Sequence, residues 1–241
     1  MIRLQWLDPD PRAPFPAVEH ALREPDGLLA AGGDLTVTRL INAYAHGIFP
    51  WFSEGEPILW WSPDPRFVLP PKEIKVTRSL GKNIRNSGLR VTMDTAFAQV
   101  IAHCSVLPRD GQNGTWITPE MQQAYINLHQ AGYAHSVECW NADKLVGGLY
   151  GINSGPVFCG ESMFSLQSNA SKIALVHLCR FIQQQGFRLI DSQVYTPHLE
   201  SLGARMIPRN AYIKTLQQEA DINLPLNWSE VFAETIKIST S

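Results

Sequence analysis

Short apolar runs separated by small polar residues dominate the chain after residue 134, a pattern typical of strands joined by tight turns. Residues 145–151 and 156–160 form two such runs around Asn153-Ser154-Gly155. These three small residues tolerate the positive φ that a tight turn demands. The pattern therefore predicts a hairpin that ends at Glu161.

A change of period after the hairpin predicts a helix and then another strand. Apolar residues recur at helical spacing from Ala170, and Gly186 is suited to close the helix in a left-handed conformation. In the strand that follows, residues 187–193, the period of two places Asp191 and Gln193 on one face, roughly 7 Å apart. We expect this carboxylate and carboxamide to be coupled through one hydrogen bond.

Helical spacing and capping residues predict three further helices upstream. The first is capped near Thr36 or Thr38 and closed by Gly47. The others are expected at 95–103 and at 119–132, the last begun by Thr118-Pro119 and ended by Gly132. Strands are expected at 89–93 and 134–140. Together these elements predict a mixed α+β fold, with a largely antiparallel sheet on which the helices pack.

The Pro63-Asp64-Pro65 run resists regular structure and indicates a domain boundary. We expect residues 1–65 to form a small N-terminal α/β domain and residues 66–241 to form a larger second domain. Three of the seven tryptophans, Trp51 among them, lie just before this boundary. Such rings either pack in cores and interfaces or provide a platform for a nucleic-acid base, and the sequence leaves both roles open.

Composition limits the class of protein. With 241 residues, 44% hydrophobic and 17% charged, the chain can bury a sizeable core. No signal-peptide pattern and no run of about 18 apolar residues is present, so we expect a cytoplasmic protein without membrane spans. The four cysteines lie far apart without a C-x-x-C pair, which favours reduced thiols over disulfides or a metal site. They are Cys104, Cys139, Cys159 and Cys179.

A net charge of −2 and a pI near 6.4 exclude a general nucleic-acid binder, but the charge is unevenly distributed. Seven Lys and Arg residues lie between residues 66 and 90 against the single acid Glu73, which is the footprint expected for phosphate contacts. A solvated face balanced by acids elsewhere is an equally open alternative. The candidate phosphate contacts are Lys72, Lys75, Arg78, Lys82 and Arg85, called the basic stripe below; Arg66 and Arg90 flank them.

Three polar residues stand at the ends of the apolar strands. Glu161, Asp191 and Gln193 follow glycine-flanked or apolar runs, where a buried carboxylate is costly unless it is used or paired. We therefore expect a functional site here. The structural alternative is that Asp191 and Gln193 only satisfy each other in a loop.

The distal order of three strands, a helix and a strand is similar to the acyl-CoA N-acyltransferase (GNAT) fold. That family cradles the CoA pyrophosphate with a glycine-rich turn at the start of the central helix, and residues 161–172 contain no such turn. The resemblance in fold therefore does not bring acetyl-CoA with it. An acetyltransferase remains an alternative, and so does a non-catalytic tRNA-binding protein.

Motifs spread over residues 15–210 closely resemble the bacterial leucyl/phenylalanyl-tRNA–protein transferase family. The resemblance implies an aminoacyltransferase that moves leucine or phenylalanine, with methionine as a third candidate, from charged tRNA onto an N-terminal Arg or Lys. Such transfer feeds the N-degron (N-end rule) pathway of protein degradation, with no cofactor and no metal. The motifs are Gly32-Gly33-Asp34-Leu35, Gly47-Ile48-Phe49-Pro50-Trp51-Phe52, Trp60-Trp61-Ser62-Pro63-Asp64-Pro65-Arg66, Thr115-Trp116-Ile117, His135-Ser136-Val137-Glu138, Val146-Gly147-Gly148, Gly160-Glu161-Ser162-Met163-Phe164-Ser165, Ala170-Ser171-Lys172 and Ser201-Leu202-Gly203-Ala204.

The resemblance also implies roles for individual residues. Gln193 would lie against the reacting centre, Asp191 would orient it, and Glu161 would read the polar end of the substrate. Trp51 and Trp116 would stack on the terminal adenosine, and the basic stripe would hold the acceptor stem. The aminoacyl side-chain pocket would be lined by Leu149, Phe158, Met163 and Ile190.

The chain departs from the family pattern at three positions near this site. Ser192 stands where cysteine is common, and we expect that change to be neutral. Thr196 stands where asparagine is common, which puts one substrate hydrogen bond in doubt. Leu149 replaces what is often methionine, so the balance among leucine, phenylalanine and methionine is open.

Overall fold

The computed structural model describes residues 4–106, 116–218 and 227–240 and contains two sheets. The larger sheet is mostly antiparallel, and only β9 and β10 run parallel within it. Its strands, in spatial order, are β11 (Arg205–Ile207), β5 (Arg66–Leu69), β10 (Leu189–Asp191), β9 (Val157–Ser165), β8 (Lys144–Ser154), β7 (Ala134–Asn141) and β6 (Arg90–Met93). The smaller sheet consists of β1 (Gln5–Trp6), β2 (Leu28–Ala31), β4 (Leu59–Trp61) and β3 (Phe49–Pro50).

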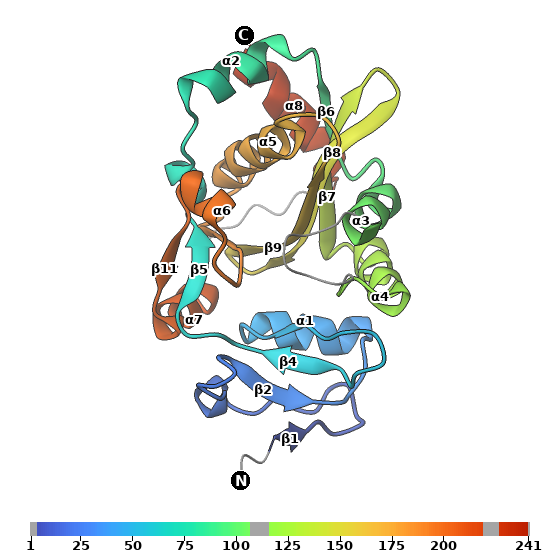
Figure 1. Ribbon diagram of the computed structural model, residues 1–241, viewed down its shortest axis with the longest axis vertical. Helices are drawn as coiled ribbons and strands as arrows, with labels where there is room; N and C mark the ends of the chain where they lie inside the picture. The colour runs from blue at the N-terminus through green and yellow to red at the C-terminus, as the bar shows by residue number, and fades with distance from the viewer. Residues whose placement is uncertain (1–3, 107–115, 219–226, 241) are drawn as a thin grey trace.

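Helices cover both faces of the larger sheet, and the small sheet lies at the end that carries the N-terminus (Figure 1). One buried cluster joins the sheet to α5 (Ala170–Gln184) and α8 (Trp228–Thr240), and another joins it to α3 (Phe97–Val106) and α4 (Pro119–Gln130). The fold is therefore mixed α+β, as the sequence predicts. The remaining helices are α1 (Val37–Ala45), α2 (Arg78–Asn86), α6 (Pro197–Ser201) and α7 (Arg209–Leu216), with short 3₁₀ turns η1 (Val18–His20) and η2 (Pro71–Glu73).

Capping residues start and stop these helices where the sequence predicts. The Thr36 hydroxyl accepts a hydrogen bond from the Arg39 amide at the start of α1, and Thr118 does the same for Met121 in α4. Gly186 follows α5 with a φ of 88°, a left-handed conformation that glycine adopts without a steric penalty.

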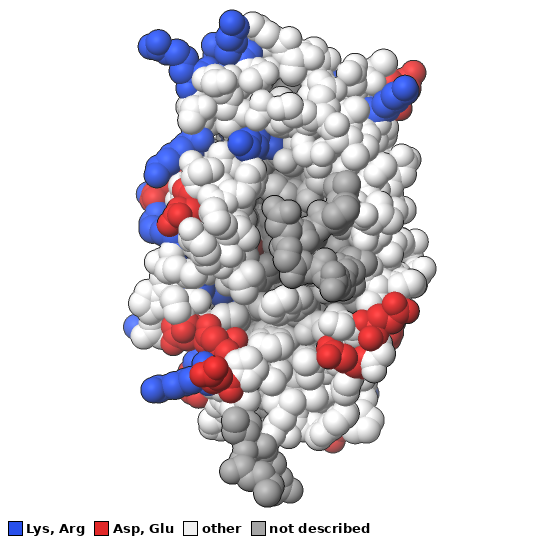
Figure 2. Space-filling view, in the orientation of Figure 1, with Lys and Arg blue, Asp and Glu red and all other residues white. Residues whose placement is uncertain are grey.

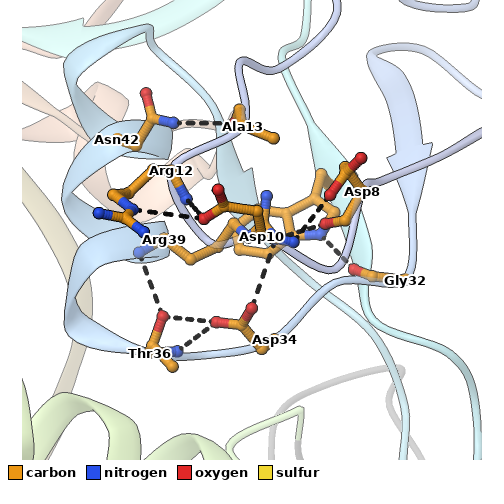
Figure 3. A network of polar contacts seen from close by, with 10 residues as sticks. Asp8, Asp10, Arg12, Ala13, Gly32, Asp34, Thr36, Arg39 and Asn42 are labelled. Atoms are coloured by element: carbon orange, nitrogen blue, oxygen red, sulfur yellow. Dashed lines mark hydrogen bonds and ion pairs between the residues drawn. The ribbon is translucent and has the colours of Figure 1, made fainter.

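Partly buried polar contacts tie the start of α1 to the segments that follow β1 and β2 (Figure 3). The fully buried Arg39 donates to the Asp8 carbonyl at 2.6 Å and lies 3.4 Å from an Asp34 carboxylate oxygen. Buried residues of this N-terminal part and of the larger sheet belong to the same cluster, so residue 65 does not separate two cores. Through this shared cluster, α1 packs against α4.

Two local details differ from the sequence prediction. Strand β9 does not end at Glu161 but continues to Ser165, because it pairs with β8 beyond an irregularity opposite Tyr150 and Gly151. Strand β10 ends at Asp191, so Gln193 lies outside it with a φ of 57°. The strict alternation expected over 187–193 therefore fails at its last residue.

Three further observations concern the chain as a whole. All four cysteines are buried and free. Among the described residues, no group of three or more His, Cys, Asp or Glu side chains is arranged to hold a metal ion. In the same part of the chain, no helix has the length and apolar character to cross a membrane.

Candidate active site

A cavity of about 560 Å³ opens where β8, β9 and β10 meet the segment Phe49–Trp51 and the loop before α6. Its volume suits a side chain of the size of leucine or phenylalanine together with part of a larger ligand. The four residues expected to form the aminoacyl pocket all line it, as do Glu161 and Gln193. These four are Leu149, Phe158, Met163 and Ile190.

Glu161 is the residue that a β-bulge adds to β9. Tyr150 pairs with Ser162 and Gly151 pairs with Gly160, so Glu161 has no partner residue on β8. Gly151 permits this close approach, because a Cβ atom there would lie 2.3 Å from the Cys159 carbonyl oxygen. The bulge turns the Glu161 side chain into the cavity.

Neutral donors surround the Glu161 carboxylate. Its Oε1 accepts hydrogen bonds from Tyr44 Oη at 2.8 Å and from Gln193 Nε2 at 2.9 Å, and its Oε2 accepts one from Tyr125 Oη at 2.9 Å. Burial raises the pKa of Glu161 to about 7, although the hydrogen bonds from the two tyrosines oppose this shift. Glu161 can therefore gain or lose a proton near neutral pH.

Asp191, in contrast, forms an ion pair with Arg66. Arg66 donates to its two carboxylate oxygens at 2.9 and 2.7 Å, and Tyr212 Oη donates to Oδ2 at 2.9 Å. Arg66 and Asp191 are 1% and 0% exposed. Although burial opposes the charge, the carboxylate raises the pKa of Arg66 above its ordinary value. Arg66, counted by sequence at the edge of the basic region, is thus a buried ion-pair partner and not a surface group.

Gln193 connects the two carboxylates in a way that the sequence pattern does not predict. Its backbone amide donates to Asp191 Oδ1 at 2.9 Å, whereas its side-chain Nε2 donates to Glu161. The prediction of a hydrogen bond between the Asp191 and Gln193 side chains is therefore wrong. Because the strand ends at Asp191, the left-handed backbone of Gln193 turns its amide group toward Glu161.

The aromatic and variable positions also lie at the cavity. Trp51 and Trp116 both line it, and Trp51 packs against Trp61 with ring centroids 5.6 Å apart. Ser192 and Thr196 line it too. The Thr196 hydroxyl accepts a hydrogen bond from the Leu199 amide and so caps α6, which gives this position a structural role in addition to facing the cavity.

The basic stripe lies on η2, on the segment after it and on α2, outside the cavity. All five of its side chains are exposed, and positive charge gathers over the end of the molecule that carries α2, whereas acidic groups gather over the N-terminal end (Figure 2). Within the stripe region Glu73 forms an ion pair with Arg205.

Sequence reasoning did not find the roles of Arg66, Tyr44, Tyr125 and Tyr212. Tyr125 occupies an apolar position of α4 and is typical of a core residue, and Tyr44 is fully packed in α1. The bonds to the carboxylates span 125 residues for Arg66 and 117 for Tyr44. The only local signal is that a buried tyrosine hydroxyl needs a partner.

A cavity with apolar walls, a titratable carboxyl group and a carboxamide has the composition expected of an enzyme site. The family profile described as "Leucyl/phenylalanyl-tRNA protein transferase" matches residues 68–217, and the profile of the corresponding N-terminal domain matches residues 33–64. The chain is 63% identical over 215 residues to the leucyl/phenylalanyl-tRNA–protein transferase of Chromohalobacter salexigens, covering 89% of this chain and 83% of the relative. It is 54% identical over 224 residues to that of Xanthomonas axonopodis pv. citri, covering 92% and 90%.

These matches extend over both sheets, and the chain belongs to the leucyl/phenylalanyl-tRNA–protein transferase family. Among solved structures, it is similar to a conserved protein of unknown function from Bacteroides thetaiotaomicron, with a TM-score of 0.44 and 15% identity. That similarity covers 64% of this chain and 55% of the other.

Proposed function

We propose that this enzyme transfers leucine or phenylalanine from its charged tRNA to the N-terminal Arg or Lys of an acceptor protein, in the bacterial cytoplasm. This transfer marks the acceptor for the N-degron pathway. The observation that carries the proposal is one cavity that combines four apolar lining residues, two tryptophans, and the polar pair Glu161 and Gln193. Each group matches one part of an aminoacyl-adenosine end.

The apolar part of the cavity supports recognition of the aminoacyl side chain. Phe158 and Ile190 provide rigid walls, while Met163 is flexible enough to adapt to both a branched and an aromatic guest. Leucine and phenylalanine share an unbranched Cβ, so walls close to that carbon would exclude isoleucine and valine. We propose Trp51 and Trp116 as the platform for the terminal adenine.

The reaction is the attack of an α-amine on the ester that joins the amino acid to tRNA. The amine must be neutral and aligned, and the developing oxyanion must be stabilised. Gln193 Nε2 donates to Glu161, which leaves its carbonyl oxygen to accept a hydrogen bond from the amine. Because a carboxamide is a poor base, Gln193 would orient the amine, while Asp191 fixes the Gln193 backbone and Glu161 contacts the charged or polar end of the substrate.

We also propose two features of the larger molecule. Residues 66–241 would form a GNAT-like catalytic domain, which is supported by the order β7-β8-β9-α5-β10 with β10 parallel to β9. The exposed basic stripe would hold the acceptor stem without reading its sequence, since charged side chains on phosphates give sequence-independent affinity.

Transfer of labelled leucine from tRNA to short peptides tests the proposal. Peptides that begin with Arg or Lys should accept the label, because the Glu161 carboxyl group lines the cavity and its ionised form attracts a cationic side chain. Peptides identical except for an N-terminal Ala or Glu serve as matched controls and should remain unlabelled. Equal labelling of all four peptides, or of none, would contradict the proposed function.

A further inference from the structure

Three oxygen-bearing groups from separate parts of the chain form a closed triangle, and one of them, Glu161, lines the cavity. Tyr44 Oη on α1 lies 2.6 Å from Tyr125 Oη on α4, and each hydroxyl also lies within 2.9 Å of a carboxylate oxygen of Glu161 on β9. All three separations are short enough for an O–H···O hydrogen bond. Each therefore needs one proton between its two oxygens.

The number of protons depends on the charge of Glu161. Each tyrosine contributes one hydroxyl proton, so an ionised Glu161 leaves two protons for three contacts. If both hydroxyls donate to the carboxylate, the two tyrosine oxygens face each other at 2.6 Å with no proton between them. If one tyrosine hydroxyl donates to the other instead, one of the two contacts between a tyrosine oxygen and a carboxylate oxygen is left without a proton.

A protonated Glu161 removes this deficit. Its Oε2–H donates to Tyr125, the Tyr125 hydroxyl donates to Tyr44, and the Tyr44 hydroxyl donates back to Oε1, which also accepts the hydrogen bond from Gln193. All three contacts of the triangle then hold a proton. Such a closed ring leaves no buried hydroxyl unsatisfied, and its bonds polarise one another.

We propose that Tyr44 and Tyr125 are positioning residues that make Glu161 a proton acceptor in the transfer reaction, because the ring of three hydrogen bonds is complete only when Glu161 carries a proton. Burial acts in the same direction, since it raises the pKa of Glu161 to about 7. Hydrogen bonds donated by both hydroxyls to an ionised Glu161 would lower this pKa, but making both leaves the two tyrosine oxygens 2.6 Å apart with no proton between them. The pKa values of both tyrosines are raised well above the ordinary value by burial, so neither hydroxyl gives up its proton to the ring.

The consequence for catalysis rests on the proposed function. An acceptor amine, with an ordinary pKa of about 7.7–8.0, arrives largely as an ammonium ion. One proton leaves its nitrogen and bonds to Glu161, while the electron pair of the broken N–H bond stays on nitrogen and attacks the ester carbonyl carbon. As the C–O bond of the ester breaks, a second proton from the nitrogen passes to the ribose oxygen, so the tRNA leaves with a free hydroxyl. Ammonium and carboxylate thus become amine and carboxyl, and no further reactant is needed.

Other groups near Glu161 do not supply the missing proton. Asp191 raises the pKa of Glu161 by repulsion, but its own charge is bound to Arg66, and Gln193 donates only an amide proton. Among the described residues, the ionisable groups near Glu161 include Tyr44 on α1, Tyr125 on α4, Tyr150 on β8, Cys159 on β9 and Asp191 on β10. Tyr195 and His198 line the same cavity, and Arg66 on β5 and Tyr212 on α7 contact Asp191.

Carbon-13 NMR of the full chain, labelled at the glutamate carboxyl carbon, tests the ring without any substrate. The Glu161 signal is identified by its loss in Glu161→Gln. In Tyr44→Phe and in Tyr125→Phe the protonated form loses two ring bonds and the ionised form loses one, so the pKa of Glu161 should fall by roughly 1 unit, about the net value of one hydrogen bond. The double variant should lower the pKa no further than either single variant.

Tyr133→Phe is the matched control, because it removes the hydroxyl of an exposed tyrosine outside the cavity lining, and it should leave the Glu161 pKa unchanged. A rise in pKa in both single variants would show that the hydroxyls only donate to an ionised carboxylate, and would overturn the ring. An unchanged pKa would overturn it as well.

The transfer rate provides the second readout. The acid limb of its pH profile should move to lower pH in Tyr125→Phe by the same amount as the NMR pKa. If the NMR shift occurs and the acid limb stays in place, Glu161 does not accept the proton of the amine. Complete absence of transfer by the wild-type enzyme, with the NMR shifts intact, would instead contradict the proposed function and not the ring.

Discussion

Two carboxylates near one cavity are stabilised in opposite ways. Asp191 lies at the end of β10 against the Arg66 guanidinium, so its negative charge is matched by a fixed positive charge. Glu161 lies in the bulge of β9 among two phenols and an amide, which are neutral donors. The comparison teaches that a permanent cation fixes a charge and thereby a geometry, whereas neutral donors leave the charge free to change.

Gln193 is the point at which the two environments meet. Its backbone amide donates to Asp191, the partner of Arg66, and its side chain donates to Glu161. The ion pair of Arg66 and Asp191 therefore positions the Gln193 side chain, which contacts the titratable Glu161. Substitutions on the Asp191 side should change stability, and substitutions on the Glu161 side should change rates and pH dependence.

The largest effect is expected when Asp191 loses its charge. Asp191→Ala leaves the Arg66 guanidinium buried without its partner, which should reduce the free energy of unfolding by about 3–5 kcal/mol. Urea denaturation measures this loss. The paired change Arg66→Met with Asp191→Leu removes both charges and should recover most of it. A double variant as unstable as the single one would mean that the ion pair is not the source.

The next largest effect, on turnover, is expected when the Gln193 side chain is removed. Gln193→Ala removes the amide that faces the amine and should lower the single-turnover transfer rate on the order of 10²-fold, about 2.7 kcal/mol. Stability should change little, and a nonhydrolysable phenylalanyl-adenosine should still bind, since apolar walls and tryptophans hold it. Near wild-type turnover by the folded variant would reduce Gln193 to a structural residue.

A further effect concerns the pH dependence of stability. The folded-state pKa of Glu161 is about 7 against an ordinary 4.5, so its contribution to stability is fully present below about pH 4.5 and is lost as the pH rises to about 7. Glu161→Gln lacks this titration. The difference in unfolding free energy, wild type minus variant, should therefore fall between pH 4.5 and pH 7 and stay level above it. A difference independent of pH would contradict the raised pKa.

The sequence predicts most of the elements because their signals are local. The threonine caps, the closing glycines and the periods of two and 3.6 residues all act within a few positions, so α1, α4, α5 and the strands β7 to β9 lie close to where they are expected. The apolar pocket residues follow from resemblance to the family, and the structure brings all four of them to one cavity.

The parts of the site that the sequence does not predict depend on contacts across the fold. A tyrosine such as Tyr44 fits the apolar face of a helix, and nothing within its own helix reveals that its hydroxyl meets a carboxylate on another element. Arg66 has the same difficulty, since its charge is indistinguishable in sequence from those of exposed neighbours. The expectation for Gln193 fails for a local reason, because a strand ended two residues early.

The bulge in β9 also determines which face of the strand its later side chains occupy. Phe158 and Met163 both line the cavity although five positions separate them, and in a regular strand an odd separation sends two side chains to opposite faces. The extra residue cancels this mismatch. A lineage that lost one residue at 161 would therefore lose the carboxyl group and would also turn Met163 away from the amino-acid pocket. The alternation of side chains along β9 thus constrains insertions and deletions in this strand, whatever residue is added or removed.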